Sequence, residues 1–216
     1  MDYYIGGIKV IVKNMSKKKI QILDAQAGYD LAAFSYDKKE KYLNSFEDKE
    51  MLKILGDLKN KKVLDVGAGT GRLSVKLSEA GGSVTALDIS EKMLEILHQK
   101  NKKIITVVGD AEDLPFSDDS FDIIVGAFLV VHLKNPAIFF AEAYRVLKNG
   151  GILLITNINQ KEPPEIATPK GNIKIVSFYH QPENLKEKLD ELAFTVAEKV
   201  VSTSEVWVNQ ILKCIK

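Results

Sequence analysis

Between residues 62 and 156, short apolar runs alternate with helical patterns, and this alternation limits the fold more than any other feature of the sequence. Short continuous apolar runs bounded by glycine or polar turns are typical of strands that are buried on both faces. Such strands, separated by helices, predict an α/β fold with a mostly parallel sheet and helices on both sides. The predicted strands are residues 62–66, 84–88, 104–108, 121–125 and 152–156, and the predicted helices are residues 73–80, 90–97 and 136–147.

The chain before this region has a different texture. Residues 20–58 carry apolar side chains at roughly helical spacing without a strand pattern, so they are predicted to be mostly helical. Residues 1–14 are predicted to form a short strand or a loose arm. We therefore divide the chain into an N-terminal arm and helical cap, residues 1–58, and a core domain, residues 59–216.

The chain after this region returns to strands near its end. Residues 157–174 are predicted to be a proline-rich loop, and residues 182–192 a helix. Residues 194–201 and 206–215 have strand patterns and are joined by a short polar turn. Strands joined by a short turn pair antiparallel, so the sheet is predicted to end with an antiparallel strand.

The composition excludes several classes of protein. The 30 basic and 29 acidic residues leave a net charge of +1, without the basic excess typical of proteins that bind nucleic acid. The single cysteine, Cys214, excludes an internal disulfide and a metal site built on cysteines, and it favours a reducing compartment. No apolar run is long enough to span a bilayer, and the N-terminus has no signal-peptide pattern. We expect a soluble, cytoplasmic monomer or homodimer that acts without nucleic acid, membrane or metal.

The segment Val63–Gly71, VLDVGAGTG, places three glycines between a predicted strand and a predicted helix. Glycine lets the backbone turn sharply and approach a ligand, and the amides at a helix N-terminus donate to anionic or polar groups. In the dinucleotide-binding fingerprint, the third glycine follows the second by three residues. Here that position is Arg72, because the third glycine comes one residue earlier. The loop therefore fits a ligand without a diphosphate better.

Acidic residues end three consecutive predicted strands. Asp65, just before the glycines, would repel phosphate and pair with an ammonium group. Asp88 can accept hydrogen bonds from both hydroxyls of a ribose. Asp110 can accept from an adenine amine, and the amide of Ala111 can serve a ring nitrogen. Loop capping by Asp65 and a favourable helix N-terminal charge at Asp88 are the alternative interpretations.

Together these motifs resemble the class I S-adenosylmethionine-dependent methyltransferases, in order and spacing, through VLDVGAGTG, VTALDIS, GDAEDLPF, FDIIVGAFLVVHL and YRVLKNGGILLIT. The resemblance is strong over residues 60–157 and looks closest to the small-molecule group that includes the ubiquinone- and biotin-pathway enzymes. It implies a Rossmann-like seven-stranded sheet with an antiparallel last strand, a small N-terminal helical cap, and S-adenosylmethionine as cofactor. The predicted cofactor-binding residues are Tyr29, Tyr36, Asp65, Gly67, Ala68, Gly69, Thr70, Gly71, Asp88, Ile89, Met93, Asp110, Ala111, Glu112 and Phe128.

Two tyrosines precede the core in GYDLAAFSYD, which resembles the cap that folds over the cofactor in this family. Tyr29 and Tyr36 lie seven residues apart, so they share one face of a helix. One ring could lie near the sulfonium, where a cation–π attraction is favourable. Plain packing of these rings on the core is the equally supported alternative.

His132 is the predicted general base, because it follows the fourth strand on the side where an acceptor would enter. A packed or solvent-facing histidine is the alternative. His180 borders the C-terminal helix and is a second, weaker candidate. A base is needed only if the nucleophile still holds its proton at the working pH.

The predicted function is methyl transfer from S-adenosylmethionine to a small-molecule acceptor by in-line displacement. The sequence lacks the Asn/Asp-Pro-Pro-Tyr signature of base methylation, which argues against a nucleic-acid substrate. Two other classes stay open: a non-catalytic relative that binds the cofactor, and a NAD-dependent oxidoreductase. The glycine spacing and Asp65 argue against the oxidoreductase.

Overall fold

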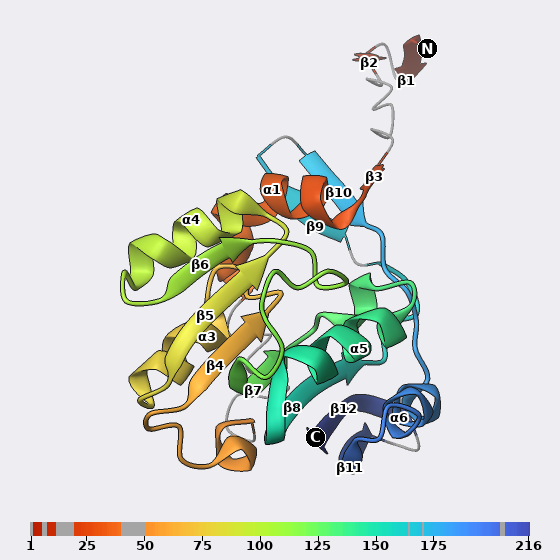
Figure 1. The fold of residues 1–216 in the computed structure, drawn as a ribbon. Coiled ribbons are helices and arrows are strands. Elements are labelled where there is room, and N and C mark those ends of the chain that lie inside the picture. Colours follow the sequence, from red (N-terminus) through yellow and green to blue (C-terminus); the bar gives the residue numbers. More distant parts are fainter. Residues whose placement is uncertain are drawn as a thin grey trace.

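A computed structural model of the chain describes residues 2–5, 8–11, 20–39, 51–163, 165–169, 171–203 and 206–216. Its centre is a seven-stranded sheet with the order β11-β12-β8-β7-β4-β5-β6 (Figure 1). The strands are β4 (Lys62–Val66), β5 (Ser83–Asp88), β6 (Ile105–Val108), β7 (Phe121–Gly126), β8 (Leu147–Ile158), β11 (Thr195–Thr203) and β12 (Val206–Ile215).

The strand directions agree with the sequence-based prediction. β4 pairs in parallel with both β5 and β7, β5 pairs in parallel with β6, and β7 with β8. β12 pairs antiparallel with β8 and with β11, so it alone runs against the other strands. The predicted Rossmann-like α/β fold with an antiparallel last strand is therefore confirmed. Cys214 lies buried in β12.

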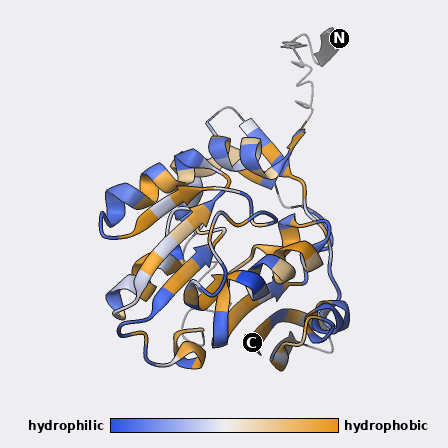
Figure 2. Cartoon of the chain, viewed as in Figure 1, coloured by the Kyte–Doolittle hydropathy of each residue, from blue (hydrophilic) through white to orange (hydrophobic). Residues whose placement is uncertain are grey.

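Helices cover both faces of this sheet. α3 (Arg72–Glu79), α4 (Glu91–Lys100) and the helical residues 51–55 pack on one face. α5 (Pro136–Val146) and α6 (Pro182–Asp190) pack on the other. Figure 2 shows hydrophobic residues along much of β8 and β12, and mixed polar and apolar residues along α4 and α5.

The two-residue period of a strand explains why the strands are apolar throughout. In β4, Val63 packs into the core under α3 and α4, whereas the next residue, Leu64, packs into the core under α5 and α6. In β8, Leu153 and Leu154 divide between the two cores in the same way. Neither face of these strands meets water, so no polar alternation remains.

A second, smaller unit lies beyond the carboxyl ends of β4 and β5, whose arrowheads point toward it in Figure 1. It consists of the helix α1 (Ala25–Tyr36), the short 3₁₀ helix η1 (Asp37–Lys39) and a three-stranded sheet of order β3-β10-β9. The strands are β3 (Gln21–Leu23), β9 (Glu165–Thr168) and β10 (Gly171–Ile175). Apolar side chains of α1, β9 and β10, together with Met93, form its core. We call this unit the cap.

The cap corrects two predictions. Residues 20–58 are not helical throughout, because residues 21–23 form β3, which pairs in parallel with β10. Residues 157–174 are not all loop, because β9 and β10 pair antiparallel and bury Ile166 and Ile173 against α1. Both errors have one cause: these strands are three to five residues long and depend on partners far away in the chain.

The predicted division at residue 58 stays a prediction, although β10 belongs to the predicted core and pairs with β3 of the predicted cap. In the predicted arm, β1 (Asp2–Ile5) and β2 (Ile8–Ile11) form an antiparallel pair. The remaining residues of the arm, residues 40–50 of the predicted helical cap, and the turn residues 204–205 lie outside the described residues. Among the described residues, every helix is too short or too polar to cross a membrane.

Candidate active site

A cavity of about 340 Å³ lies between the carboxyl edge of the large sheet and α1 of the cap. The carboxyl edge of an open α/β sheet is the usual place for a ligand, and this volume is in the range of small-molecule sites. Of the predicted site residues, the following line the cavity: Tyr29, Tyr36, Asp65, Gly67, Ala68, Gly69, Thr70, Asp88, Ile89, Met93, Asp110, Ala111, Glu112, Phe128 and His132.

The glycine loop after β4 reaches the cavity through left-handed backbone. Gly67 and Gly69 have φ angles of 72° and 55°, a region that glycine adopts without steric cost. The amides of Gly67 and Ala68 both donate to the carbonyl oxygen of Leu87, which joins the loop to the end of β5. The backbone can therefore lie directly against a ligand here.

Gly71 differs from the other two glycines because it does not line the cavity. It is buried at the start of α3 with φ 86°, and a Cβ atom there would lie 2.1 Å from Cδ1 of Leu97. The absence of a side chain at Gly71 lets the loop pack closely against α4. The predicted direct contact of Gly71 with the ligand is therefore not supported by the cavity lining.

Asp88 ends β5 and is 7% exposed. Its Oδ2 accepts from the amide of Gly69 and its Oδ1 from the amide of Ser90, both at 2.8 Å. Burial raises the pKa of Asp88 and outweighs these two hydrogen bonds, which lower it. The carboxylate of Asp88 is held by these two amides and lines the cavity. Each of its oxygens keeps a second lone pair, so it can accept hydrogen bonds from a pair of hydroxyl groups.

The charged side chains that line the cavity are mostly acidic. Asp65 is 2% exposed and accepts a hydrogen bond at 2.5 Å from the Ser74 hydroxyl of α3. Together with Asp88, Asp110 and Glu112 it surrounds a space into which Arg72 also reaches. Such a site disfavours phosphate and favours a ligand that carries positive charge.

The loop after β6 supplies Asp110, Ala111 and Glu112. Oδ1 of Asp110 accepts from the amide of Glu112 at 2.9 Å, which closes a tight turn. Burial, and then the charge of Asp110, raises the pKa of Glu112. Two carboxylates therefore stand close together at the rim, where hydrogen-bond donors of a ligand would stabilise them.

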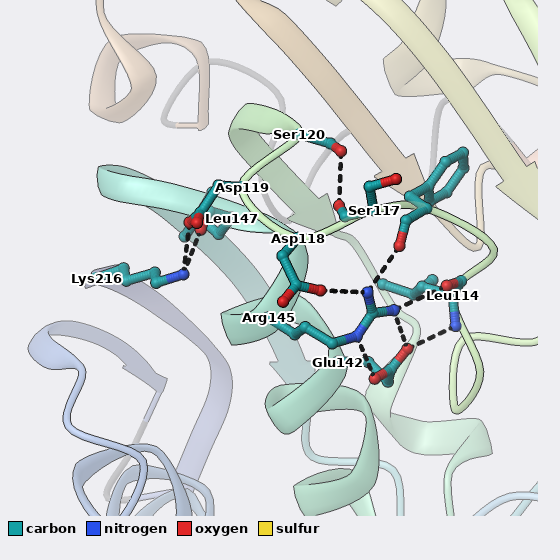
Figure 3. Close-up of polar contacts among 10 residues, drawn as sticks. Leu114, Ser117, Asp118, Asp119, Ser120, Glu142, Arg145, Leu147 and Lys216 are labelled. Atoms are coloured by element: carbon teal, nitrogen blue, oxygen red, sulfur yellow. Dashed lines mark hydrogen bonds and ion pairs between the residues drawn. The ribbon is translucent and has the colours of Figure 1, made fainter.

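This loop is held in place from α5 by Arg145, as Figure 3 shows. The guanidinium donates to the carbonyl oxygens of Leu114 and Phe116 at 2.9 and 2.7 Å. It also forms a two-point pair with Glu142, which in turn accepts from the amide of Leu114 at 2.9 Å. The planar fork of arginine suits this geometry, so Arg145 fixes the chain that follows the acidic rim.

Polar contacts join the cap to the core around the cavity. The hydroxyl of Ser90 donates to Asp30 of α1 at 2.6 Å, and the same side chain caps α4 by accepting from the amide of Met93. Asp37 accepts from the Thr70 hydroxyl at 2.5 Å and pairs with Lys100 of α4 at 2.8 Å. These contacts place α1 over the glycine loop and close one side of the cavity.

Tyr29 and His132 meet inside the cavity, although they are 103 residues apart in the chain. The Tyr29 hydroxyl lies 2.6 Å from Nε2 of His132, and Nδ1 of His132 lies 3.1 Å from the carbonyl oxygen of Val176. A carbonyl only accepts, so Nδ1 carries the proton and Nε2 accepts from Tyr29. Burial lowers the pKa of His132 and, ahead of Tyr36 and Asp88, raises the pKa of Tyr29. Both groups are therefore neutral at neutral pH.

The remaining predicted residues differ in whether they line the cavity. The rings of Tyr29 and Tyr36 are 5.7 Å apart in an edge-to-face arrangement, and both line the cavity. Phe128, with a left-handed φ of 56°, lies under the guanidinium of Arg72 at 5.4 Å. His180 does not line the cavity, and its Nε2 donates to the carbonyl oxygen of Leu133 at 2.9 Å. Its part as a second, weaker candidate base stays a prediction.

Sequence reasoning missed several lining residues, of which Asp24 and Gln26 at the start of α1 and Leu129 and Leu133 after β7 are examples. The two leucines follow a predicted strand end and are apolar, a signal that could have placed them at the site. Asp24 caps α1 by accepting from the amide of Ala27, which is an N-cap pattern visible in the sequence.

The sheet order, the glycine loop and the acids at the strand ends define the class I S-adenosylmethionine-dependent methyltransferase fold. Residues 64–155 match a family model described as a methyltransferase domain. This match agrees with the resemblance that the motifs predicted. The possible histamine N-methyltransferase of Thermotoga maritima superposes with a TM-score of 0.67 at 19% identity, over 88% of this chain and 99% of that one. Magnesium protoporphyrin IX methyltransferase from Synechocystis, with bound S-adenosylhomocysteine, has a TM-score of 0.62 at 18% identity, with 82% of each chain covered.

Sequence relatives point to one branch of the class. The demethylmenaquinone methyltransferase of Tropheryma whipplei (strain Twist) is 35% identical over 133 residues, 59% of this chain and 56% of that protein. The same enzyme from Staphylococcus aureus (strain MRSA252) is 38% identical over 122 residues, 54% of this chain and 51% of that protein. The aligned part thus spans just over half the length of these relatives. Their names agree with the predicted resemblance to quinone-pathway enzymes.

Proposed function

We propose that the chain binds S-adenosylmethionine in the cavity and transfers its methyl group to a small-molecule acceptor. The observation that carries the proposal is the acidic lining around a glycine loop, because the cofactor has an ammonium and a sulfonium but no phosphate. NAD, the alternative ligand, would bring a diphosphate against the glycine loop and Asp65. The cavity therefore favours the methyl donor over the dinucleotide.

The fit assigns a part of the cofactor to each group of residues. Asp88 would accept from the ribose hydroxyls, and Asp110 with the amide of Ala111 would receive the adenine. Asp65 and the glycine loop would hold the amino-acid end. The cofactor supplies an activated methyl group. The protein then needs to align the acceptor and to exclude water, which α1 and its aromatic residues help to do.

The finer proposal concerns the acceptor. The named relatives are demethylmenaquinone methyltransferases, so we propose an aromatic acceptor with a hydroxyl group, of the reduced naphthoquinone type. The part of the cavity near Tyr29, Phe128 and Leu133 is apolar and aromatic, which suits such a ring. His132 is the proposed general base of this reaction.

Calorimetric titration tests the proposal directly. S-adenosylmethionine and S-adenosylhomocysteine are expected to bind, and NAD is not. Methyl transfer to 1,4-naphthohydroquinones with a short side chain, followed by mass spectrometry, then tests the acceptor. Binding of NAD in preference to both methyl-donor forms would refute the proposal. Tight binding of the cofactor without transfer to any small molecule would favour the non-catalytic alternative.

A further inference from the structure

Tyr29 and His132 both line the cavity and contact each other through the Tyr29 hydroxyl and Nε2 of His132, so the geometry raises the question of which group meets the acceptor. The only lone pair that His132 has for a proton is at Nε2, since Nδ1 carries the hydrogen bonded to Val176. That lone pair is 2.6 Å from the Tyr29 hydroxyl. An acceptor hydroxyl could not approach Nε2 without first displacing Tyr29.

We propose that Tyr29 and His132 act together as a proton relay, in which Tyr29 receives the proton of a phenolic acceptor hydroxyl and passes its own to His132. This inference rests on the proposed function. It adds Tyr29 as a residue that touches the substrate, and it limits the acceptor to molecules with an ionisable aromatic hydroxyl.

The step balances without a further reactant. The O–H bond of the acceptor breaks and its electron pair stays on the acceptor, which becomes a phenolate. The proton bonds to the Tyr29 oxygen while the proton of Tyr29 bonds to Nε2 of His132. Tyr29 ends neutral and His132 ends as an imidazolium, so a neutral pair becomes a phenolate and a cation.

The surroundings of the pair support a transient rather than a resting charge. Burial keeps the pKa of His132 low and that of Tyr29 high, so neither group is ionised before the acceptor arrives. The groups that face Tyr29 are Tyr36 and Asp88, and the group that faces Nδ1 of His132 is the Val176 carbonyl. The carbonyl of Val176 is electron-rich, so it favours the imidazolium once the proton arrives.

A structural role for the pair is the competing explanation, since the contact also ties α1 of the cap to η2 (Val130–His132) of the core. The two roles make different demands. A tie between elements needs the Tyr29–His132 contact but no change in the ionisation of a bound phenol. A relay needs both groups for the ionisation of the bound phenol. It predicts that the aromatic ring of Tyr29 without its hydroxyl does not support this ionisation.

The test uses the full chain loaded with S-adenosylhomocysteine and 4-nitrophenol as an optical probe of phenol ionisation. In the wild-type complex, the phenolate absorbance is expected to appear at a pH lower by about one unit or more than in the His132→Ala complex, because the imidazolium stabilises the phenolate. Tyr29→Phe is expected to lose the same effect. His98→Ala, an exposed histidine of α4, is the matched control and should behave as wild type.

The outcomes are distinct. Calorimetry first measures the affinity of each variant for S-adenosylhomocysteine, so that every ionisation measurement is made on a saturated cofactor complex. Absence of cofactor binding in the wild type would refute the proposed function itself. Cofactor binding with a wild-type ionisation of the probe in either Tyr29→Phe or His132→Ala would overturn the relay. Failure of the cofactor complex to bind any 4-nitrophenol would overturn the phenolic acceptor class.

Discussion

The close contact between Gly71 and Leu97 makes a quantitative prediction about stability. A Cβ at Gly71 would lie 2.1 Å from Cδ1 of Leu97, which is fully buried, and residue 71 has a φ of 86°. The left-handed backbone costs a side chain about 1–2 kcal/mol, and overpacking costs about 1–3 kcal/mol more. Gly71→Ala is therefore expected to lower the free energy of unfolding by about 2–5 kcal/mol.

Gly56 provides the matched control for this prediction. Its φ is 74°, but a Cβ there would have nothing within 4 Å. Gly56→Ala should therefore cost only the backbone part, about 1–2 kcal/mol. The assay is urea unfolding of the cofactor-free protein, followed by circular dichroism.

A third variant separates the clash from the backbone effect. Leu97→Ala alone opens a cavity and costs about 2–5 kcal/mol, but in the Gly71→Ala background it also removes the clash. The double variant should therefore be more stable than the sum of the two single changes predicts. Equal losses for Gly71→Ala and Gly56→Ala, or strict additivity with Leu97→Ala, would show that the packing argument is wrong.

Three further predictions concern the acidic rim and Asp88, the proposed ribose-binding residue. Arg145→Ala should weaken S-adenosylhomocysteine binding and lower the free energy of unfolding by about 1–3 kcal/mol, as measured by calorimetry and urea unfolding. Arg145→Lys should restore neither property, because lysine lacks the planar fork of arginine. The control Lys186→Ala, which removes an exposed ion pair, should change neither. Asp88→Asn should weaken cofactor affinity by roughly 10- to 100-fold, since the amide has a single accepting oxygen and its NH2 group only donates. An affinity equal to that of wild type in titration calorimetry would rule out the ribose contact. The hydrogen bond from Arg145 lowers the pKa of Glu142 in the folded state below its usual value of 4.5. Glu142 therefore stabilises the fold at pH values above 4.5, and this stabilisation is lost as the pH falls through the lower pKa of the folded state. Arg145→Ala should flatten this acid limb of the unfolding curve, and an unchanged limb would count against the pairing.

Local patterns were sufficient for the core of this protein. Val63, Leu64 and their counterparts in the other central strands are apolar because both faces of the sheet are covered, and such runs are visible in any short window of sequence. Ser90 as an N-cap and the glycine loop are also local, since the residues that interact lie within a few positions of one another. Asp88 could be placed because a parallel strand brings its last residue to a known edge.

Contacts between distant residues were not predictable in this way. β3 was missed because three residues carry no pattern of their own and become a strand only beside β10. The hold of Arg145 on the loop after β6 joins residues about 30 positions apart, and no period in the sequence signals it.

The sequence by itself determined the sheet, the glycine bend and the acids at its edge, because hydrophobic periodicity and strand ends are properties of neighbouring residues. Only the tertiary structure decided which face of α1 meets the core and that Tyr29 occupies the one free lone pair of His132. That pairing depends on how the cap docks, and docking is set by the packing of side chains drawn from three separate parts of the chain.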